Sequence, residues 1–238
     1  MAESFDIGIN YPLVRSDDGR VFVVPIDPIV ASIEYVMAAG VLGDVAEFGC
    51  YMGNTAQMLA CALHNCGIKY QSIETALKRE RSLWLFDSFE GFPTTNHAVD
   101  FASPHIKDGL WYAGQPAGGN PDEVHRLCSR FLPAEHVHVI KGWYKDTLSQ
   151  IPKNRRFALL HIDCDYYESA FQVLDHLFTH AMVSDGCTIL FDDWYCNRGS
   201  PMYGEQAAWR DACVKHKIWF SEVGAYGVVG QRVIVHVG

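Results

Sequence analysis

Short apolar runs alternate with helical patterns along most of the chain. The runs cover residues 44–49, 83–86, 137–140, 157–162 and 187–191. Residues with helical spacing of apolar positions cover 28–40, 54–66, 167–181 and 204–216. Near-continuous apolar runs are typical of strands that are buried on both faces of a sheet. Alternation of such strands with helices predicts an α/β fold with a parallel, doubly wound, Rossmann-like sheet.

Three segments depart from this alternation. Residues 1–30 contain several prolines and are predicted to be irregular, so residues 1–43 form an N-terminal extension that ends in a helix. Residues 218–237 predict two strands around Gly224–Gly227, and therefore an antiparallel C-terminal hairpin. Residues 93–122 hold four prolines and four glycines and are predicted to lack regular structure. We interpret them as a lid rather than a disordered insert, because they carry Phe101, Trp111 and Tyr112.

Length and composition restrict the class of protein. A chain of 238 residues with 49% hydrophobic and 20% charged residues predicts a single globular domain over 1–238. The net charge of −9 gives no electrostatic support for binding nucleic acid or an anionic membrane. The N-terminus lacks the pattern of a signal peptide, and the eight cysteines form no C-x-x-C pair. We therefore expect a cytoplasmic protein with reduced thiols.

A glycine turn follows the first strand. Gly49 would allow a tight turn, and Gly53 would allow a ligand to approach the start of the next helix. The spacing is G-x-x-x-G, which differs from the G-x-G-x-x-G of dinucleotide-binding proteins. An ordinary strand-to-helix turn therefore remains an alternative at this position.

Acidic residues follow three of the strands. Asp87 ends the second strand, where a carboxylate can accept hydrogen bonds from ribose hydroxyls; an Asx-turn is the alternative. Asp163 and Asp165 follow the fourth strand, and Asp192 and Asp193 follow the fifth. Four carboxylates at neighbouring strand ends repel one another unless a cation neutralises them, and oxygen ligands suit Mg²⁺. Helix capping would explain Asp165 or Asp193 singly but not all four acids.

Other catalytic patterns are absent from the sequence. It contains neither the H-E-x-x-H spacing of zinc enzymes nor the G-x-S-x-G of hydrolases. The eleven histidines therefore indicate no metal site of their own.

Five stretches of the chain resemble the macrocin-type sugar O-methyltransferases, which methylate deoxysugar hydroxyls on macrolides and aminocoumarins. They cover residues 45–56, 83–93, 141–148, 161–169 and 192–194, in the order found in the family. The most specific strings are Asp87-Ser88-Phe89-Glu90-Gly91-Phe92-Pro93 and His161-Ile162-Asp163-Cys164-Asp165-Tyr166-Tyr167-Glu168-Ser169. The resemblance implies a seven-stranded class I methyltransferase sheet with one reversed edge strand.

The resemblance also implies a cofactor, a metal and a role for individual residues. S-adenosylmethionine would be the methyl donor, with Glu47, Gly49, Gly53 and Thr55 at its methionine side, Asp87 at its ribose, and Gly142 and Trp143 near its adenine. Asp163 would belong both to this site and to the metal site. Mg²⁺, or alternatively Mn²⁺, would be held by Asp163, Asp192 and Asp193, with Asp165 as the general base. A cation that holds the acceptor hydroxyl in line with the methyl group would let a carboxylate serve as base.

The implied activity is methyl transfer to a sugar hydroxyl of a small glycosylated molecule. A catechol or polyphenol acceptor is an alternative, because vicinal diols chelate a cation in the same way. A nicotinamide-dependent oxidoreductase would share the fold and the ribose-binding acid, and a non-catalytic binding module is a further alternative. The family also leads us to expect a homo-oligomer.

Overall fold

The computed structural model describes residues 27–78, 80–116 and 118–237, together with three short N-terminal strands. These strands are β1 (Ser4–Phe5), β2 (Leu13–Arg15) and β3 (Val21–Val23), and they pair antiparallel in a small sheet of their own. The prediction of irregular structure over residues 1–30 is therefore wrong at these strands, whereas the helix predicted from residue 28 is confirmed. The remaining residues of 1–26 lie outside the described part of the chain.

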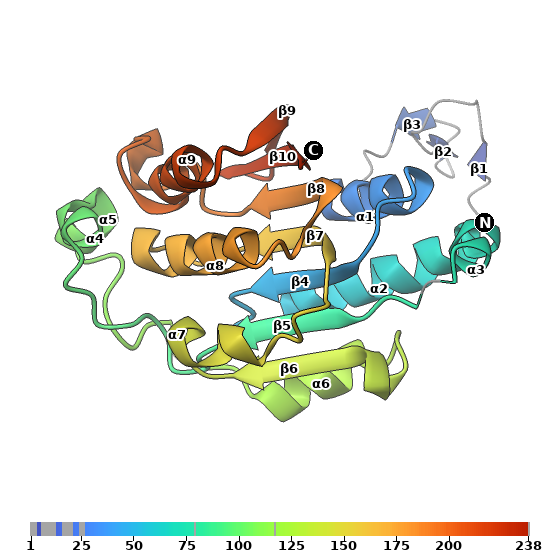
Figure 1. The fold of residues 1–238 in the computed structure, drawn as a ribbon, viewed down its shortest axis with the longest axis horizontal. Coiled ribbons are helices and arrows are strands. Elements are labelled where there is room, and N and C mark those ends of the chain that lie inside the picture. Colours follow the sequence, from blue (N-terminus) through green and yellow to red (C-terminus); the bar gives the residue numbers. More distant parts are fainter. Residues whose placement is uncertain are drawn as a thin grey trace.

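A seven-stranded sheet forms the centre of the molecule (Figure 1). Its strands are β4 (Asp44–Phe48), β5 (Leu83–Asp87), β6 (Val137–Lys141), β7 (Phe157–Ile162), β8 (Val183–Phe191), β9 (Trp219–Tyr226) and β10 (Gly230–His236). Their order is β6-β5-β4-β7-β8-β10-β9, and the first five are parallel. All five predicted parallel strands and the C-terminal hairpin are confirmed. The reversed strand, β10, pairs with both β8 and β9 and so lies one place in from the edge.

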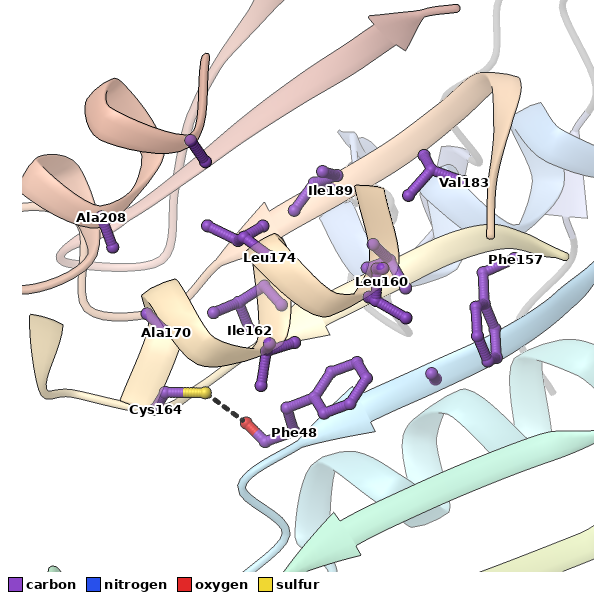
Figure 2. Packing of buried hydrophobic residues seen from close by; sticks show 14 of the residues in the cluster. Phe48, Phe157, Leu160, Ile162, Cys164, Ala170, Leu174, Val183, Ile189 and Ala208 are labelled. Carbon is purple, nitrogen blue, oxygen red and sulfur yellow. Dashed lines mark hydrogen bonds between the residues drawn. The ribbon is translucent and has the colours of Figure 1, made fainter. Parts of the chain in front are cut away.

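Helices cover both faces of this sheet. They are α1 (Pro28–Ala38), α2 (Asn54–Lys69), α3 (Gln71–Ala76), α4 (Ala98–Ala102), α5 (Pro104–Lys107), α6 (Pro121–Cys128), α7 (Tyr144–Thr147), α8 (Tyr167–Thr179) and α9 (Gly204–His216). One buried cluster joins the sheet to α8 and α9, and a second joins its other face to α1, α2 and α6. Figure 2 shows the first cluster, in which Phe48 and Leu160 of the sheet lie beneath Leu174 of α8. Successive residues of β5 alternate between the two clusters, as the pleat of a strand requires: Trp84 and Phe86 belong to the first, and Leu83 and Leu85 to the second.

Burial explains how well each strand could be predicted. Every residue of β4 and β7 is buried, whereas β6 is only half-buried because it lies at the edge of the sheet. β8 begins at Val183, four residues before the predicted start at 187, because its first part includes exposed and half-buried positions that break the apolar run.

The expectation that residues 93–122 lack regular structure is also wrong. The segment contains α4 and α5, and α6 begins at Pro121. These helices are too short to produce a recognisable period in the sequence. Within the described residues, every helix is too short or too polar to span a bilayer.

Candidate active site

The carboxyl ends of five strands meet at one edge of the sheet. Backbone hydrogen bonds continue the ladder just beyond the strands and hold the following turns in register. These bonds, each 2.9 Å long, run from the amide of Gly49 to Phe86, of Gly142 to Asp87, of Asp163 to Phe48 and of Asp192 to Ile162. The predicted turns therefore lie side by side, where ligands bind in open parallel sheets.

A cavity of about 870 Å³ opens at this edge. Its wall includes seven of the predicted site residues: Gly49, Asp87, Gly142, Trp143, Asp163, Asp165 and Asp193. Among the described residues, Glu47, Gly53, Thr55 and Asp192 lie outside this wall. Gly53 precedes α2, and Thr55 lies in the first turn of that helix. The volume is within the range of sites that hold a cofactor and a small ligand.

Gly49 makes the turn after β4 possible. Its φ angle is +100°, and a Cβ atom placed there would lie 1.8 Å from the carbonyl oxygen of Asp163. A side chain would therefore push the end of β4 away from the end of β7. The glycine keeps the predicted cofactor turn in contact with the first acidic turn.

Asp87 joins the turns that follow β4 and β5. Its Oδ2 accepts hydrogen bonds from the backbone amides of Cys50, at 2.7 Å, and Tyr51, at 2.8 Å. Its Oδ1 accepts one from the amide of Phe89 at 2.6 Å, which is the contact of an Asx-turn. The structural alternative considered for Asp87 is thus present, and the carboxylate also lines the cavity.

Three carboxylates converge in the wall of the same cavity. Asp163, Asp165 and Asp193 each present an oxygen atom, and these atoms all lie within 4.8 Å of one another. Burial raises the pKa of each carboxyl, and repulsion between Asp163, Asp165 and Asp193 raises the pKa values of the first two further. A hard divalent cation would relieve this repulsion, and carboxylate oxygens are the donors that it prefers. The residues present therefore fit a magnesium or manganese site.

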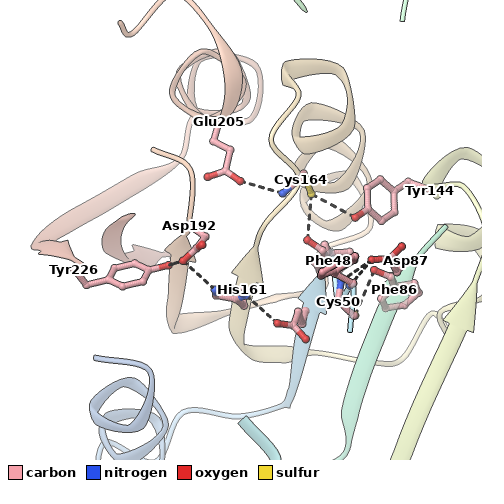
Figure 3. Close-up of polar contacts among 12 residues, drawn as sticks. Phe48, Cys50, Phe86, Asp87, Tyr144, His161, Cys164, Asp192, Glu205 and Tyr226 are labelled. Atoms are coloured by element: carbon pink, nitrogen blue, oxygen red, sulfur yellow. Dashed lines mark hydrogen bonds and ion pairs between the residues drawn. The ribbon is translucent and has the colours of Figure 1, made fainter. Parts of the chain in front are cut away.

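Asp192 lies outside this group of three. Its Oδ1 accepts a hydrogen bond from the Tyr226 hydroxyl at 3.2 Å and lies 3.8 Å from His161 Nε2 (Figure 3). On its other side, His161 Nδ1 lies 3.2 Å from Glu47 Oε1. Burial alone would lower the pKa of His161, but Asp192 and Glu47 outweigh it and raise that pKa well above its usual value. The nearby His161 ring in turn lowers the pKa of Asp192.

Glu205 is a site residue that the sequence reasoning missed. It is fully buried in the first turn of α9, and it accepts hydrogen bonds from the amides of Cys164 and Asp193. Figure 3 shows it reaching from the helix towards Cys164. The only signal in the sequence was an acidic residue in the first turn of a predicted helix. That signal does not show which groups Glu205 contacts.

The predicted lid is anchored to two other regions of the structure. Asp100 of α4 is buried and accepts hydrogen bonds from the amides of Tyr167 and Glu168, at the start of α8. His105 and Asn197 exchange two hydrogen bonds, each from a backbone amide to the partner's side chain. These contacts attach the segment both to α8 and to the loop that follows Asp193.

Aromatic residues of this segment, and Phe92 just before it, form part of the cavity wall. Phe92, Trp111 and Tyr112 line the cavity. The Phe92 ring stacks on Tyr166, with centroids 4.9 Å apart, and Trp111 packs against His105 at 4.6 Å. Aromatic rings and the acidic group therefore line the same cavity, which suits a ligand with both hydroxyl groups and an apolar face.

Comparison with known proteins places this chain in a family. Residues 25–217 match the family described as Macrocin-O-methyltransferase (TylF). The chain is 31% identical over 174 residues to the 8-demethyl-8-(2,3-dimethoxy-alpha-L-rhamnosyl)-tetracenomycin-C 4'-O-methyltransferase of Streptomyces olivaceus, which covers 71% of this chain and 59% of that protein. It is 30% identical over 163 residues to the demethyldecarbamoylnovobiocin O-methyltransferase of Streptomyces niveus, and this match covers 68% of this chain and 56% of that protein. The chain thus spans less than two thirds of the length of either relative.

A solved structure shares the fold. The O-methyltransferase NovP superposes with a TM-score of 0.63 at 24% sequence identity, covering 88% of this chain and 78% of NovP. The methyltransferase fold that the sequence predicts is therefore confirmed.

Proposed function

Because the chain belongs to the macrocin-O-methyltransferase family, we propose that it methylates a hydroxyl group of a small glycosylated molecule. The methyl donor would be S-adenosylmethionine, and a divalent cation would be bound beside the acceptor. One observation carries this proposal: Gly49, Asp87 and the three converging carboxylates all line the same cavity. Donor and acceptor can therefore meet within one cavity.

The donor side of the site is assigned to the turns after β4, β5 and β6. Asp87 would hold the ribose, and Gly142 and Trp143 would lie against the adenine. Gly49 would leave room for the methionine part. Glu47, Gly53 and Thr55 would shape the turn from behind, since they lie outside the cavity wall. Exclusion of water by Trp111 and Phe92 would favour transfer to the acceptor.

The metal side has two possible sets of ligands. Asp163 and Asp193 belong to both. The resemblance adds Asp192 and leaves Asp165 as the base, whereas the geometry groups Asp165 with the other two. When bound, Mg²⁺ or Mn²⁺ would lower the pKa of the acceptor hydroxyl and fix its position. A carboxylate that is not a ligand would then accept the hydroxyl proton.

The first test is a titration of the EDTA-treated protein with S-adenosylmethionine, followed by turnover with glycosides and sugar diols. Formation of S-adenosylhomocysteine, read by mass spectrometry, should require Mg²⁺ or Mn²⁺. Asp163→Asn and Asp193→Asn should abolish turnover, and Asp193→Asn should do so without loss of the donor's affinity. Full activity in metal-free buffer would refute the metal proposal, and absence of donor binding would refute the assigned function.

The role of Asp165 can be separated from that of Asp192. A ligand variant should bind Mn²⁺ more weakly in the absence of substrates, whereas a base variant should bind it normally and lose kcat. We expect Asp165→Asn to behave as the base variant and Asp192→Asn as the ligand variant. The reverse result would assign the ligand set to the three carboxylates that the geometry groups together.

The acceptor is distinguished by the same assay. Turnover of catechols but not of glycosides would favour the catechol alternative, since both acceptors offer vicinal oxygens. Membership in a methyltransferase family argues against a nicotinamide-dependent oxidoreductase. A bound donor with no turnover across a broad acceptor panel would support the non-catalytic alternative.

We also propose a cytoplasmic homo-oligomer. All eight cysteines are free thiols, which suits a reducing compartment. β9 is an edge strand with Trp219 and Val223 exposed, and an exposed apolar edge favours association of copies. Light scattering after size exclusion should report more than one chain per particle, and a monomer at micromolar concentration would contradict the proposal.

A further inference from the structure

Glu205 connects the two acidic turns of the site through their backbones. Its Oε1 accepts a hydrogen bond from the amide of Cys164 at 3.1 Å, and its Oε2 accepts one from the amide of Asp193 at 3.0 Å. Cys164 lies between Asp163 and Asp165, so each acidic turn gives one amide to the same carboxylate. The side chain is 0% exposed.

The residues beside Glu205 contact the same turns. Gly204 has a φ angle of +55°, and a Cβ atom there would lie 3.1 Å from the carbonyl oxygen of Asp165. Gln206 Nε2 donates a hydrogen bond to the carbonyl of Trp194 at 2.6 Å. The first turn of α9 therefore lies close to both acidic turns. It accepts hydrogen bonds from their backbone amides and donates one to the carbonyl of Trp194.

We propose that Glu205 is a positioning residue for the metal site: it holds the turns after β7 and β8 at the separation that brings together Asp163 and Asp193, which belong to both possible ligand sets. This inference rests on the proposed metal-dependent function. Glu205 itself does not line the cavity, and it is not one of the three residues whose carboxylate oxygens converge. It therefore acts through the backbone amides of the two acidic turns.

The chemistry of the contact explains why a carboxylate stands here. Two amide donors require two acceptors, and a carboxylate supplies both, whereas a glutamine would turn an NH₂ group towards one of the amides. A buried carboxylate beside three others repels them, so fold stability alone would favour an uncharged residue. Groups that orient metal ligands in this way commonly change metal affinity when they are altered.

The test is Glu205→Gln in the full chain, with Mn²⁺ as the probe. Free Mn²⁺ is measured by its paramagnetic resonance signal in the absence of donor and acceptor. We expect Mn²⁺ binding to weaken about 10- to 100-fold, which is the usual effect of changing a group that orients metal ligands. Binding of S-adenosylmethionine should be unchanged, and lost activity should recover as the Mg²⁺ concentration rises. A purely structural role would not produce this recovery.

The matched control is Glu74→Gln. Glu74 is also a buried acid, but it accepts hydrogen bonds from the Arg81 side chain and lies outside the cavity wall. This variant should lower stability and leave Mn²⁺ affinity unchanged.

Three outcomes decide the matter. If the wild-type chain binds no Mn²⁺, the proposed metal function fails, and this inference fails with it. If the wild type binds Mn²⁺ and folded Glu205→Gln binds it equally well, the inference alone is overturned. If Glu205→Gln does not fold, Glu205→Asp takes its place in the test. The aspartate keeps the charge, but its side chain is too short to reach both amides. Weaker Mn²⁺ binding by Glu205→Asp supports the inference, and wild-type affinity overturns it.

Discussion

Replacing Asp100 with alanine should destabilise the protein and also loosen the part of the cavity wall that residues 93–122 form. Asp100 is 1% exposed, and its two carboxylate oxygens accept hydrogen bonds from Tyr167 at 2.7 Å and Glu168 at 3.0 Å. Within the described residues, Tyr166 at the start of α8 makes no capping bond with its side chain. The aspartate of α4 therefore supplies the cap for a helix that begins 67 residues later.

The size of the effect follows from these two bonds. Loss of a helix cap costs about 0.5–2 kcal/mol. Burial places the cost near the upper end, about 2 kcal/mol, because both amides lose their acceptor away from water. For a chain of this length, about 2 kcal/mol lowers Tm by roughly 4–8 °C.

Thermal unfolding of Asp100→Ala and the wild type measures this loss directly. The control is Asp27→Ala, which removes the cap of α1, where Asp27 accepts from Ile29 at 2.8 Å and Val30 at 3.4 Å. Asp27 is exposed, so water can replace it and the loss should be smaller. Asp100→Ala should also raise the KM for the acceptor, since Trp111 belongs to the same segment, without changing donor affinity. Equal Tm losses for the two variants, or an unchanged acceptor KM, would refute the reasoning.

Two further predictions concern the turn after β4 and the buried histidine of β7. Gly49→Ala should abolish binding of S-adenosylmethionine in calorimetry, because its Cβ would lie 1.8 Å from the carbonyl oxygen of Asp163. The control is Gly67→Ala in α2, whose Cβ would meet no atom within 4 Å and which should bind the donor normally. Normal binding by Gly49→Ala would show that the turn adapts to the side chain. His161→Gln should lose stability in a pH-dependent way. The pKa of His161 is raised above 6.5 by its two carboxylate neighbours, so the protonated ring stabilises the fold below pH 6.5 and this contribution disappears as the pH rises through the raised value. Urea unfolding should therefore show the largest difference from wild type at acidic pH, and a difference that grows towards alkaline pH would contradict this account.

The central sheet could be predicted because its strands are buried on both faces. β4 and β7 show this most clearly, and the α9 boundaries at 204 and 216 also matched the prediction. The short helices around Asp100 could not be predicted, because their contacts lie far away in the sequence and they are too short to show a period.

The candidate site divides in the same way. Gly49, Asp87 and the four strand-end acids were visible because they directly follow apolar runs. Which of two adjacent acids turns inward was not visible: Asp193 joins the converging group, whereas Asp192 contacts His161 and Tyr226. Glu205 was missed because its partners lie 41 and 12 residues away, and they are backbone amides, which carry no sequence signature.

The two anchors of the 93–122 segment differ in how far they depend on sequence, which bears on the design of chimeras. Asp100 binds backbone amides, and any residues in the first turn of α8 would supply them. His105 instead pairs with the side chain of Asn197, which belongs to a different loop. A segment grafted from a relative to change the acceptor would keep the first anchor with an aspartate alone. To keep the second, it would have to be transplanted together with the residue at position 197.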